Sequence, residues 1–372
     1  MGTAVLVEQA FRAALFSDVS YMKRYRVPEF YAHVESDDYW KLYFMFGGKY
    51  KPPETTHPLL GWVGSFNRET YLHREYTGTA DKRPVLLYGD SFAQCAVSQK
   101  ECFEGILNSD PDFSKNHFLL NYGVGGYGVD QIFLLYQKSI GWYKNPFVIV
   151  SMLTLDLDRS VLSVRTGQKP FYRLIDNSLV LSGIPIDPSP ESFFSKHRPQ
   201  ITSYLFRKLI YSDLFQKFIH SEGPPWRIKN YFRSEPLRLR EHIKQTNRRV
   251  ILEIIRDLRK RELDFLFVIF HPQWALVDHD DWRDEFLVKL LDSNNVSYLS
   301  SKLILKQHAG QRDARYEDYY IDNGGHPNAY QNSIIADKLK KYLLAGSSKT
   351  ERQGDLSVGS KAPIVAAPLA NP

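Results

Sequence analysis

After residue 83 the chain is organised around four nearly continuous apolar runs. They are PVLLY at 84–88, HFLLNY at 117–122, FVIVSML at 147–153 and LDFLFVIF at 263–270. Strands of a parallel sheet that is covered on both faces read as such runs, whereas half-exposed strands alternate apolar and polar residues. The pattern therefore predicts four buried parallel strands.

Helical periodicity separates these runs. A helix is predicted to begin near Glu241, and AYQNSIIADKLKKYLL at 329–344 has the same periodicity. Alternating strands and helices are typical of an α/β fold, here a three-layer sandwich with a mainly parallel sheet of four or five strands. The first of these helices carries its apolar stripe at Val250, Ile251, Ile254, Ile255 and Leu258.

Three further regions flank or interrupt this predicted domain of residues 81–345. Residues 1–80 are rich in aromatic residues and predict a helical, loop-rich lead-in packed on the domain. An insertion at about 164–240 predicts a cap over the site, with a hairpin turning at Asp176 and Asn177 and a helix over 201–219. Residues 346–372 lack periodicity and predict a disordered tail.

Composition excludes few classes of protein. The 372 residues are 43% hydrophobic and 24% charged, which is ordinary for a soluble globular chain. No apolar run approaches the ~20 residues that cross a bilayer. Glu8 and Arg12 interrupt the apolar start, which favours an amphipathic helix over a signal peptide, and both cytoplasm and export remain open.

The net charge of +6 and the basic, aromatic segment 226–240 have two interpretations. The favoured one is a solvated helical face whose long side chains cover apolar surface. The other is a patch for nucleic acid, a membrane surface or an anionic saccharide; a nucleic-acid partner is not expected. Cys95 and Cys102 would lie roughly 10 Å apart on one helix, beyond the reach of a disulfide, so two free thiols are predicted.

Polar residues follow each predicted strand, at the edge of the sheet where open α/β folds bind ligands. A serine, a glycine-rich turn, a carboxylate and a histidine can meet there, which is the set that acyl transfer by serine needs. The residues are Asp90 and Ser91 after the first strand, 121–126 after the second, Thr154 and Asp156 after the third, His271 after the fourth, and Asp322 and His326 before the last helix.

These residues suggest individual roles. Ser91 would be the nucleophile, His326 or His271 its base, and a carboxylate would orient the imidazole. The N–H groups of Ser91 and Gly126 would hold the oxyanion. Asp90 would brace the turn by hydrogen bonds.

Three motifs resemble blocks of the GDSL-like lipase/esterase superfamily, also called SGNH hydrolases. They are GDSF at 89–92, NYGVGGYG at 121–128 and DNGGHPN at 322–328, and the resemblance covers about 84–163 and 246–344. The resemblance implies His326 as the base, Asp322 as the group that orients its imidazole, an acyl-serine intermediate and no cofactor. It implies substrates among small acyl esters, lipids and O-acetylated polysaccharides.

The chain departs from the family pattern at two places. Leu155 stands where the third block carries the oxyanion Asn, so Thr154 or Gln94 would have to supply that donor. Asp322 precedes His326 by four residues rather than three, and Asn323 occupies the usual spacing.

Several alternatives remain. Ser91 could be a helix N-cap, and His271 could be the base instead of lining the pocket. GVGGYG at 123–128 also fits a dinucleotide fingerprint, which would imply an oxidoreductase. Against this reading, the motif follows the second predicted strand and not the first. The loss of the Asn could leave a ligand-binding protein without catalysis.

The favoured prediction is a serine-dependent ester hydrolase or acyltransferase that acts on a small acyl ester, including O-acylated carbohydrate. The acidic cluster at 278–281 has poor spacing for one-sided ligation, so no metal site is predicted; Asp281 would instead begin a helix. Asp156 and Asp158 are expected to pair with Arg159 at the rim of the site.

Overall fold

A computed structural model of the chain describes residues 2–48, 56–63, 81–187, 189–221, 223–277, 281–321 and 325–345. The predicted tail at 346–372 lies outside these residues. So do Asp322, Asn323 and most of the acidic cluster at 278–281.

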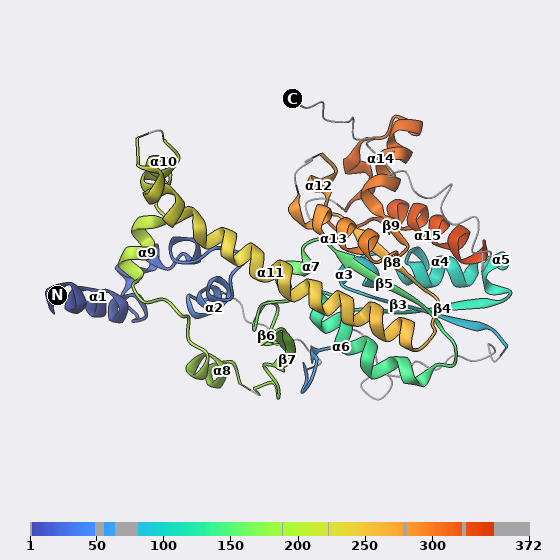
Figure 1. Ribbon diagram of the computed structural model, residues 1–372, viewed down its shortest axis with the longest axis horizontal. Helices are drawn as coiled ribbons and strands as arrows, with labels where there is room; N and C mark the ends of the chain where they lie inside the picture. The colour runs from blue at the N-terminus through green and yellow to red at the C-terminus, as the bar shows by residue number, and fades with distance from the viewer. Residues whose placement is uncertain are drawn as a thin grey trace, which may run out of the picture.

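The centre of the protein is a five-stranded sheet in which every neighbouring pair is parallel (Figure 1). Four strands coincide with the four apolar runs, so the predicted α/β class is confirmed. The fifth strand has only three residues, too few to stand out in the sequence. The strands, in their order across the sheet, are β4 (His117–Gly123), β3 (Arg83–Gly89), β5 (Phe147–Leu153), β8 (Phe265–Phe270) and β9 (Tyr298–Ser300).

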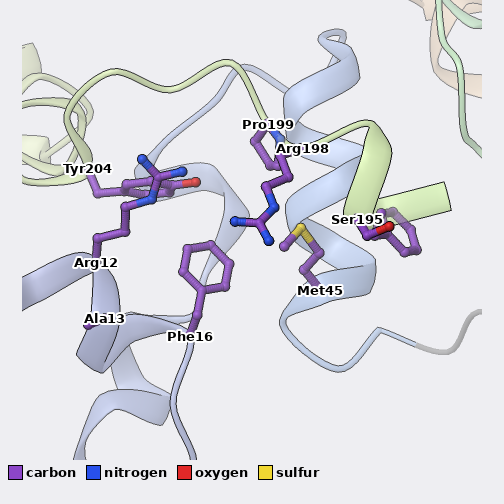
Figure 2. Close-up of a pocket in the computed structure, with 9 residues that line it drawn as sticks. Arg12, Ala13, Phe16, Met45, Ser195, Arg198, Pro199 and Tyr204 are labelled. Atoms are coloured by element: carbon purple, nitrogen blue, oxygen red, sulfur yellow. The ribbon is translucent and has the colours of Figure 1, made fainter. Parts of the chain in front are cut away.

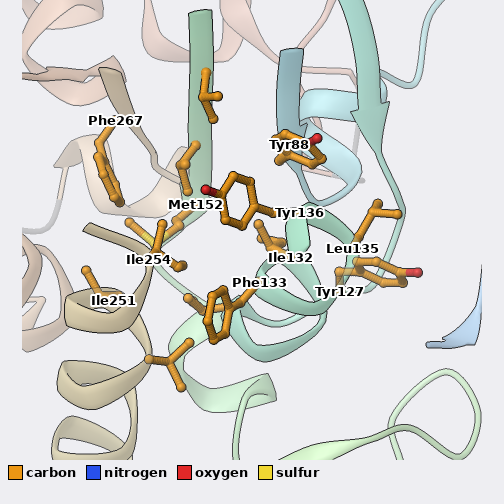
Figure 3. Packing of buried hydrophobic residues seen from close by; sticks show 14 of the residues in the cluster. Tyr88, Tyr127, Ile132, Phe133, Leu135, Tyr136, Met152, Ile251, Ile254 and Phe267 are labelled. Carbon is orange, nitrogen blue, oxygen red and sulfur yellow. The ribbon is translucent and has the colours of Figure 1, made fainter. Parts of the chain in front are cut away.

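Helices cover both faces of this sheet, which explains why its strands are apolar throughout. Leu86 and Tyr88 of β3 join a cluster with α6 (Val129–Ser139), α11 (Trp226–Lys260) and α13 (Trp282–Ser293), part of which Figure 3 shows. Val85 and Leu87 face the other cluster, with α4 (Phe103–Ser109), α14 (Ser301–Arg312) and α15 (Ala329–Leu344). The helix predicted at 329–344 therefore has the predicted bounds.

The lead-in and the insertion share a third hydrophobic cluster, which the sequence did not predict. It is built by α1 (Gly2–Leu15), α2 (Asp37–Met45), the turns between them and α9 (Tyr204–Ile210). Together with α8 (Pro190–Lys196) these helices are called the helical lobe below. Figure 1 shows α11 running from the side of this lobe to the sheet.

Two predictions about the insertion have clear outcomes. The hairpin is confirmed: β6 (Phe171–Ile175) pairs with β7 (Ser178–Ser182), and Asp176 and Asn177 have the positive φ angles of 48° and 62° that a type I′ turn requires. The helix over 201–219 is interrupted, because Ser212 begins a new helix, α10 (Asp213–His220), by accepting the N–H of Phe215.

The basic segment 226–240 is helical and belongs to α11, which begins well before the predicted start at Glu241 and includes Pro236. No helix among the described residues is long and apolar enough to cross a membrane. The remaining short elements are β1 (Thr56–His57), β2 (Gly61–Trp62), α3 (Ser91–Gln94), α5 (Pro111–Ser114), α7 (Asp156–Arg159) and α12 (Gln273–Val277), with 3₁₀ turns at Ser20–Tyr25, Pro28–Phe30, Gln99–Glu101, Ile140–Trp142 and Tyr316–Tyr319.

One arginine joins the lead-in to the main domain. The guanidinium of Arg283 contacts Glu35 of the lead-in, both carboxylate oxygens of Asp158, and Asp281. Burial raises the pKa of Asp158 to about 6, although Arg283 opposes the rise. Asp158 therefore pairs with Arg283, and the prediction that it pairs with Arg159 is wrong.

The prediction of two free thiols is also wrong, because Cys95 and Cys102 form a disulfide with their Cα atoms 5.8 Å apart. The prediction assumed one continuous helix after Ser91. In the structure α3 ends at Gln94, and Cys95 has a φ of 67°, so the chain turns back before α4 begins. Disulfides persist mainly in oxidising compartments.

Candidate active site

Ser91 lies directly beyond β3, at the start of the short helix α3. Asp90, and not Ser91, is the N-cap, because its side chain accepts the N–H of Phe92 at 2.9 Å. The serine hydroxyl is therefore not used for capping. Instead, Ser91 Oγ lies 3.0 Å from Nε2 of His326, a residue 235 positions away in the sequence.

A short, well-bonded loop presents His326. Its backbone C=O accepts the N–H of Ile321 at 2.8 Å, and Gly325 takes a φ of 65° beside it. Asn328 caps α15 by accepting the N–H of Gln331, and its own N–H donates to Tyr319 C=O. The backbone that carries the imidazole is thus held by the hydrogen bond from Ile321 on one side and by the start of α15 on the other. Asp322 and Asn323 lie outside the described residues, so the orienting carboxylate stays a prediction.

Two backbone N–H groups beside the nucleophile are free to donate. Among the described residues, neither the N–H of Ser91 nor that of Gly126 has a hydrogen-bond acceptor. Gly126 has a φ of 80°, and a Cβ there would lie 2.6 Å from Thr166 Oγ1, so only glycine fits. A Cβ on Gly125 would lie 3.7 Å from the Cβ of Ser91, which places this turn against the nucleophile.

Gln94 and Thr154, the two side chains considered as oxyanion donors, each have a polar atom without a hydrogen-bond partner among the described residues. Gln94 accepts the N–H of Gly125 at 2.7 Å through Oε1, which leaves its Nε2 without an acceptor among the described residues. Thr154 is fully buried, and its Oγ1 has no partner in the same set. Leu155 is the last residue before α7, and its side chain has no hydrogen-bond donor.

A buried ion network braces the loops behind Ser91. Arg159 Nη1 contacts Asp90 Oδ2 at 3.0 Å and Asp156 Oδ1 at 2.6 Å, and it donates to Tyr127 C=O at 3.3 Å. These residues follow β3, β5 and β4, so a single guanidinium ties three strand ends together. Burial, and then the charge of Asp90, raises the pKa of Asp156 well above its usual range. The pairing of Asp156 with Arg159 is as predicted from the sequence, but the share of Asp90 in it was not predicted.

His271 is fully buried and turned to other partners. Its Nδ1 lies 3.1 Å from Ser301 Oγ, and its Nε2 lies 2.9 Å from Asp284 Oδ1. Burial opposes ionisation of Asp284, but His271 and Lys302 lower its pKa overall. The structure therefore brings His326, and not His271, to Ser91.

The glycine-rich turn does not offer the open helix start that a dinucleotide needs. The N–H of Val129 donates to Ser160 Oγ, and that of Gln131 donates to Asp130 Oδ1. A Cβ on Gly128 would lie 2.8 Å from the backbone nitrogen of Ser160, so this glycine serves close packing against α7. A pyrophosphate would meet the carboxylate of Asp130 there. In the part of the chain that the structure describes, no cluster of three metal-ligating side chains occurs.

No family model and no curated protein matches the chain. Among solved structures, it is similar to the acetyl xylan esterase AlAXEase, with 15% identity over 70% of this chain and 99% of that chain and a TM-score of 0.39. A lipolytic protein of the G-D-S-L family from Veillonella parvula has 11% identity over 70% and 97%, with a TM-score of 0.37. A catalytic mutant of Axe2, an acetylxylan esterase from Geobacillus stearothermophilus, has 11% identity over 71% and 95%, with a TM-score of 0.35. At these low sequence identities and TM-scores, neither the activity nor the substrate of these proteins can be assigned to this chain.

Proposed function

We propose that the protein is a serine esterase or acyltransferase that uses Ser91 as its nucleophile. The observation that carries the proposal is the 3.0 Å distance between Ser91 Oγ and His326 Nε2. A serine hydroxyl is a weak nucleophile until an imidazole at this distance accepts its proton. Ser91 and His326 lie 235 positions apart in the sequence, and both side chains are partly exposed, so the pair is open to a substrate.

The reaction would proceed in two steps. Ser91 Oγ attacks the acyl carbon while its proton moves to His326 Nε2, and the N–H groups of Ser91 and Gly126 hold the resulting oxyanion. His326 then returns the proton to the departing alkoxide, which leaves an acyl-Ser91. Water completes hydrolysis, or a second alcohol completes acyl transfer. Asp322 would orient the imidazole, and Asp90 would support the turn through Arg159.

The wall beside the proposed oxyanion site supports a small acyl group. The indole of Trp62 lies 3.4 Å from where a Cβ of Gly126 would be, and its Nε1 donates to Gly125 C=O at 2.9 Å. Thr166 closes the same side. We propose a short acyl ester as substrate, with O-acylated carbohydrate as the class of acyl donor.

Labelling with a fluorophosphonate probe tests the proposal. The wild-type protein should be labelled, Ser91→Ala should not, and Ser98→Ala, a change at an exposed serine on the same segment, should be labelled like the wild type. Labelling of Ser91→Ala at the wild-type rate would remove Ser91 from the mechanism. A folded wild type that resists the probe would favour the alternative, a binding protein without catalysis. Release of acetate from acetylated xylan, measured with and without an alcohol acceptor, separates hydrolysis from transfer.

We further propose that the Gln94 amide supplies the third oxyanion donor. Its Oε1 accepts the N–H of Gly125 at 2.7 Å, which holds the amide beside the glycine-rich turn, and its Nε2 has no acceptor among the described residues. Gln94→Leu should lower kcat by about 10²–10³-fold with little change in KM, because removing one oxyanion donor typically costs that much. Thr154→Val is the matched comparison and should leave kcat near the wild-type value. The opposite ranking of the two variants would assign the donor to Thr154.

A further inference from the structure

The helical lobe contains a pocket of about 390 Å³ that none of the proposed chemistry at Ser91 uses (Figure 2). This volume is within the ~300–1,000 Å³ range of small-molecule sites. The pocket lies where α1, the end of α2, α8 and the start of α9 meet. Its lining residues are Arg12, Ala13, Phe16, Met45, Phe194, Ser195, Arg198, Pro199 and Tyr204.

Most of this lining is apolar, and two guanidinium groups interrupt it. In Figure 2 the guanidinium of Arg198 projects into the space between Phe16 and Met45. Arg12 lies over the ring of Tyr204, with its Cζ 5.6 Å from the ring centre. Among the described residues, neither arginine forms an ion pair, so two positive charges face an apolar space without a carboxylate.

The acidic side chains of this region are used elsewhere. Glu8 accepts the N–H groups of Tyr204 and Leu205 and the hydroxyl of Ser203, which caps α9. Asp38 accepts the N–H of Gln200. Their hydrogen bonds hold the stretch 200–205 that follows Arg198, and neither carboxylate forms an ion pair with Arg12 or Arg198 among the described residues.

We infer that this pocket binds an amphipathic anion, an alkyl chain that carries a carboxylate or phosphate head group. The chain would lie against Phe16, Met45 and Phe194, where apolar surface leaves water. The head group would take the planar donors of Arg198 and Arg12, which match the geometry of carboxylate and phosphate oxygens. A neutral alkyl ligand has no charged head group for the two arginines to bind, and a cationic alkyl ligand would be repelled by both of them.

Calorimetric titration of the full-length protein tests this inference. Sodium decanoate and decyl phosphate, below their critical micelle concentrations, should bind at least 10-fold more tightly than decan-1-ol, and decyltrimethylammonium should not bind. Arg12→Gln/Arg198→Gln should remove the preference for the anions. Ala13→Trp, a change at an exposed helix position that fills the pocket, should abolish binding of every ligand.

Arg24→Gln is the matched control, because Arg24 belongs to the same lobe but lies over Tyr21, outside the pocket. It should bind decanoate like the wild type. Phosphatidylglycerol vesicles distinguish the source of the anion: cosedimentation that Ala13→Trp abolishes identifies membrane lipid, whereas decanoate binding without cosedimentation identifies a free acid. Equal affinity for decanoate and decanol, or unchanged binding to a folded Ala13→Trp variant, would overturn the inference.

Discussion

Replacing His326 with glutamine should lower kcat for a p-nitrophenyl acyl ester by about 10⁴–10⁶-fold, with KM nearly unchanged. Histidine is the proposed base for Ser91, and losses of this size are typical when one member of a nucleophile–base pair is removed. Glutamine can hydrogen bond to Ser91 Oγ but cannot accept its proton. The effect is therefore on the chemical step and not on binding of the ester.

The double variant Ser91→Ala/His326→Gln sharpens this prediction. The two residues act as a unit, so the double variant should lose little more activity than either single variant. His33→Gln, a change at a partly exposed histidine of the lead-in, should retain wild-type kcat. Activity of His326→Gln within tenfold of the wild type would contradict the proposed base and would require another proton acceptor at Ser91.

Replacing Lys169 with methionine should lower the free energy of unfolding by about 3–5 kcal/mol, the typical cost of breaking a buried ion pair by removing one partner. The side chains of Lys169 and Asp130 are both 0% exposed and contact each other directly. Lys169 Nζ also donates to the C=O groups of Leu162 and Pro170 at 3.2 and 2.9 Å. Burial already raises the pKa of Asp130 to about 6 although Lys169 opposes the rise, so the variant would leave a carboxyl with no compensating charge.

Urea denaturation of matched variants measures this cost. Asp130→Asn/Lys169→Met should be less destabilised than Lys169→Met alone, because the double variant leaves no uncompensated charge. Lys196→Met removes a lysine that is 63% exposed from its contact with Asp187 and should be far less destabilising, because exposed ion pairs contribute little to stability. If Lys169→Met is no more destabilised than Lys196→Met, the pair does not stabilise the fold.

The hydrophobic pattern was sufficient to predict most of the sheet. A strand buried on both faces must be apolar at every position, so β3, β4, β5 and β8 stood out from the helices between them. β9 did not, since three residues carry no periodicity. The carboxyl ends of parallel strands meet at one edge, so Ser91 after β3 and His271 after β8 could both be expected there, whereas His326 follows no strand directly and was favoured by its motif resemblance.

Other features depended on where the chain turns, which the residue types do not reveal. Cys95 leaves helical geometry at a single positive φ, and this turn brings its Cα within 5.8 Å of Cys102. The spacing of Asp156 and Arg159 indicated an ion pair, but only packing between strand ends could add Asp90 to it. The predicted cap over the site and the domain bounds stay predictions, as does the role of Asp322.

By itself, the sequence determined the α/β class, the order of the predicted strands along the chain and the serine at the end of the first of them, because local periodicity and strand-end placement are properties of short segments. The tertiary structure alone decided which histidine reaches Ser91, that Gln94 anchors Gly125, and that the lead-in and insertion enclose a pocket with two arginines that form no ion pair among the described residues. These depend on contacts between residues far apart in the chain, and such contacts form only when the whole set of helices and strands packs together.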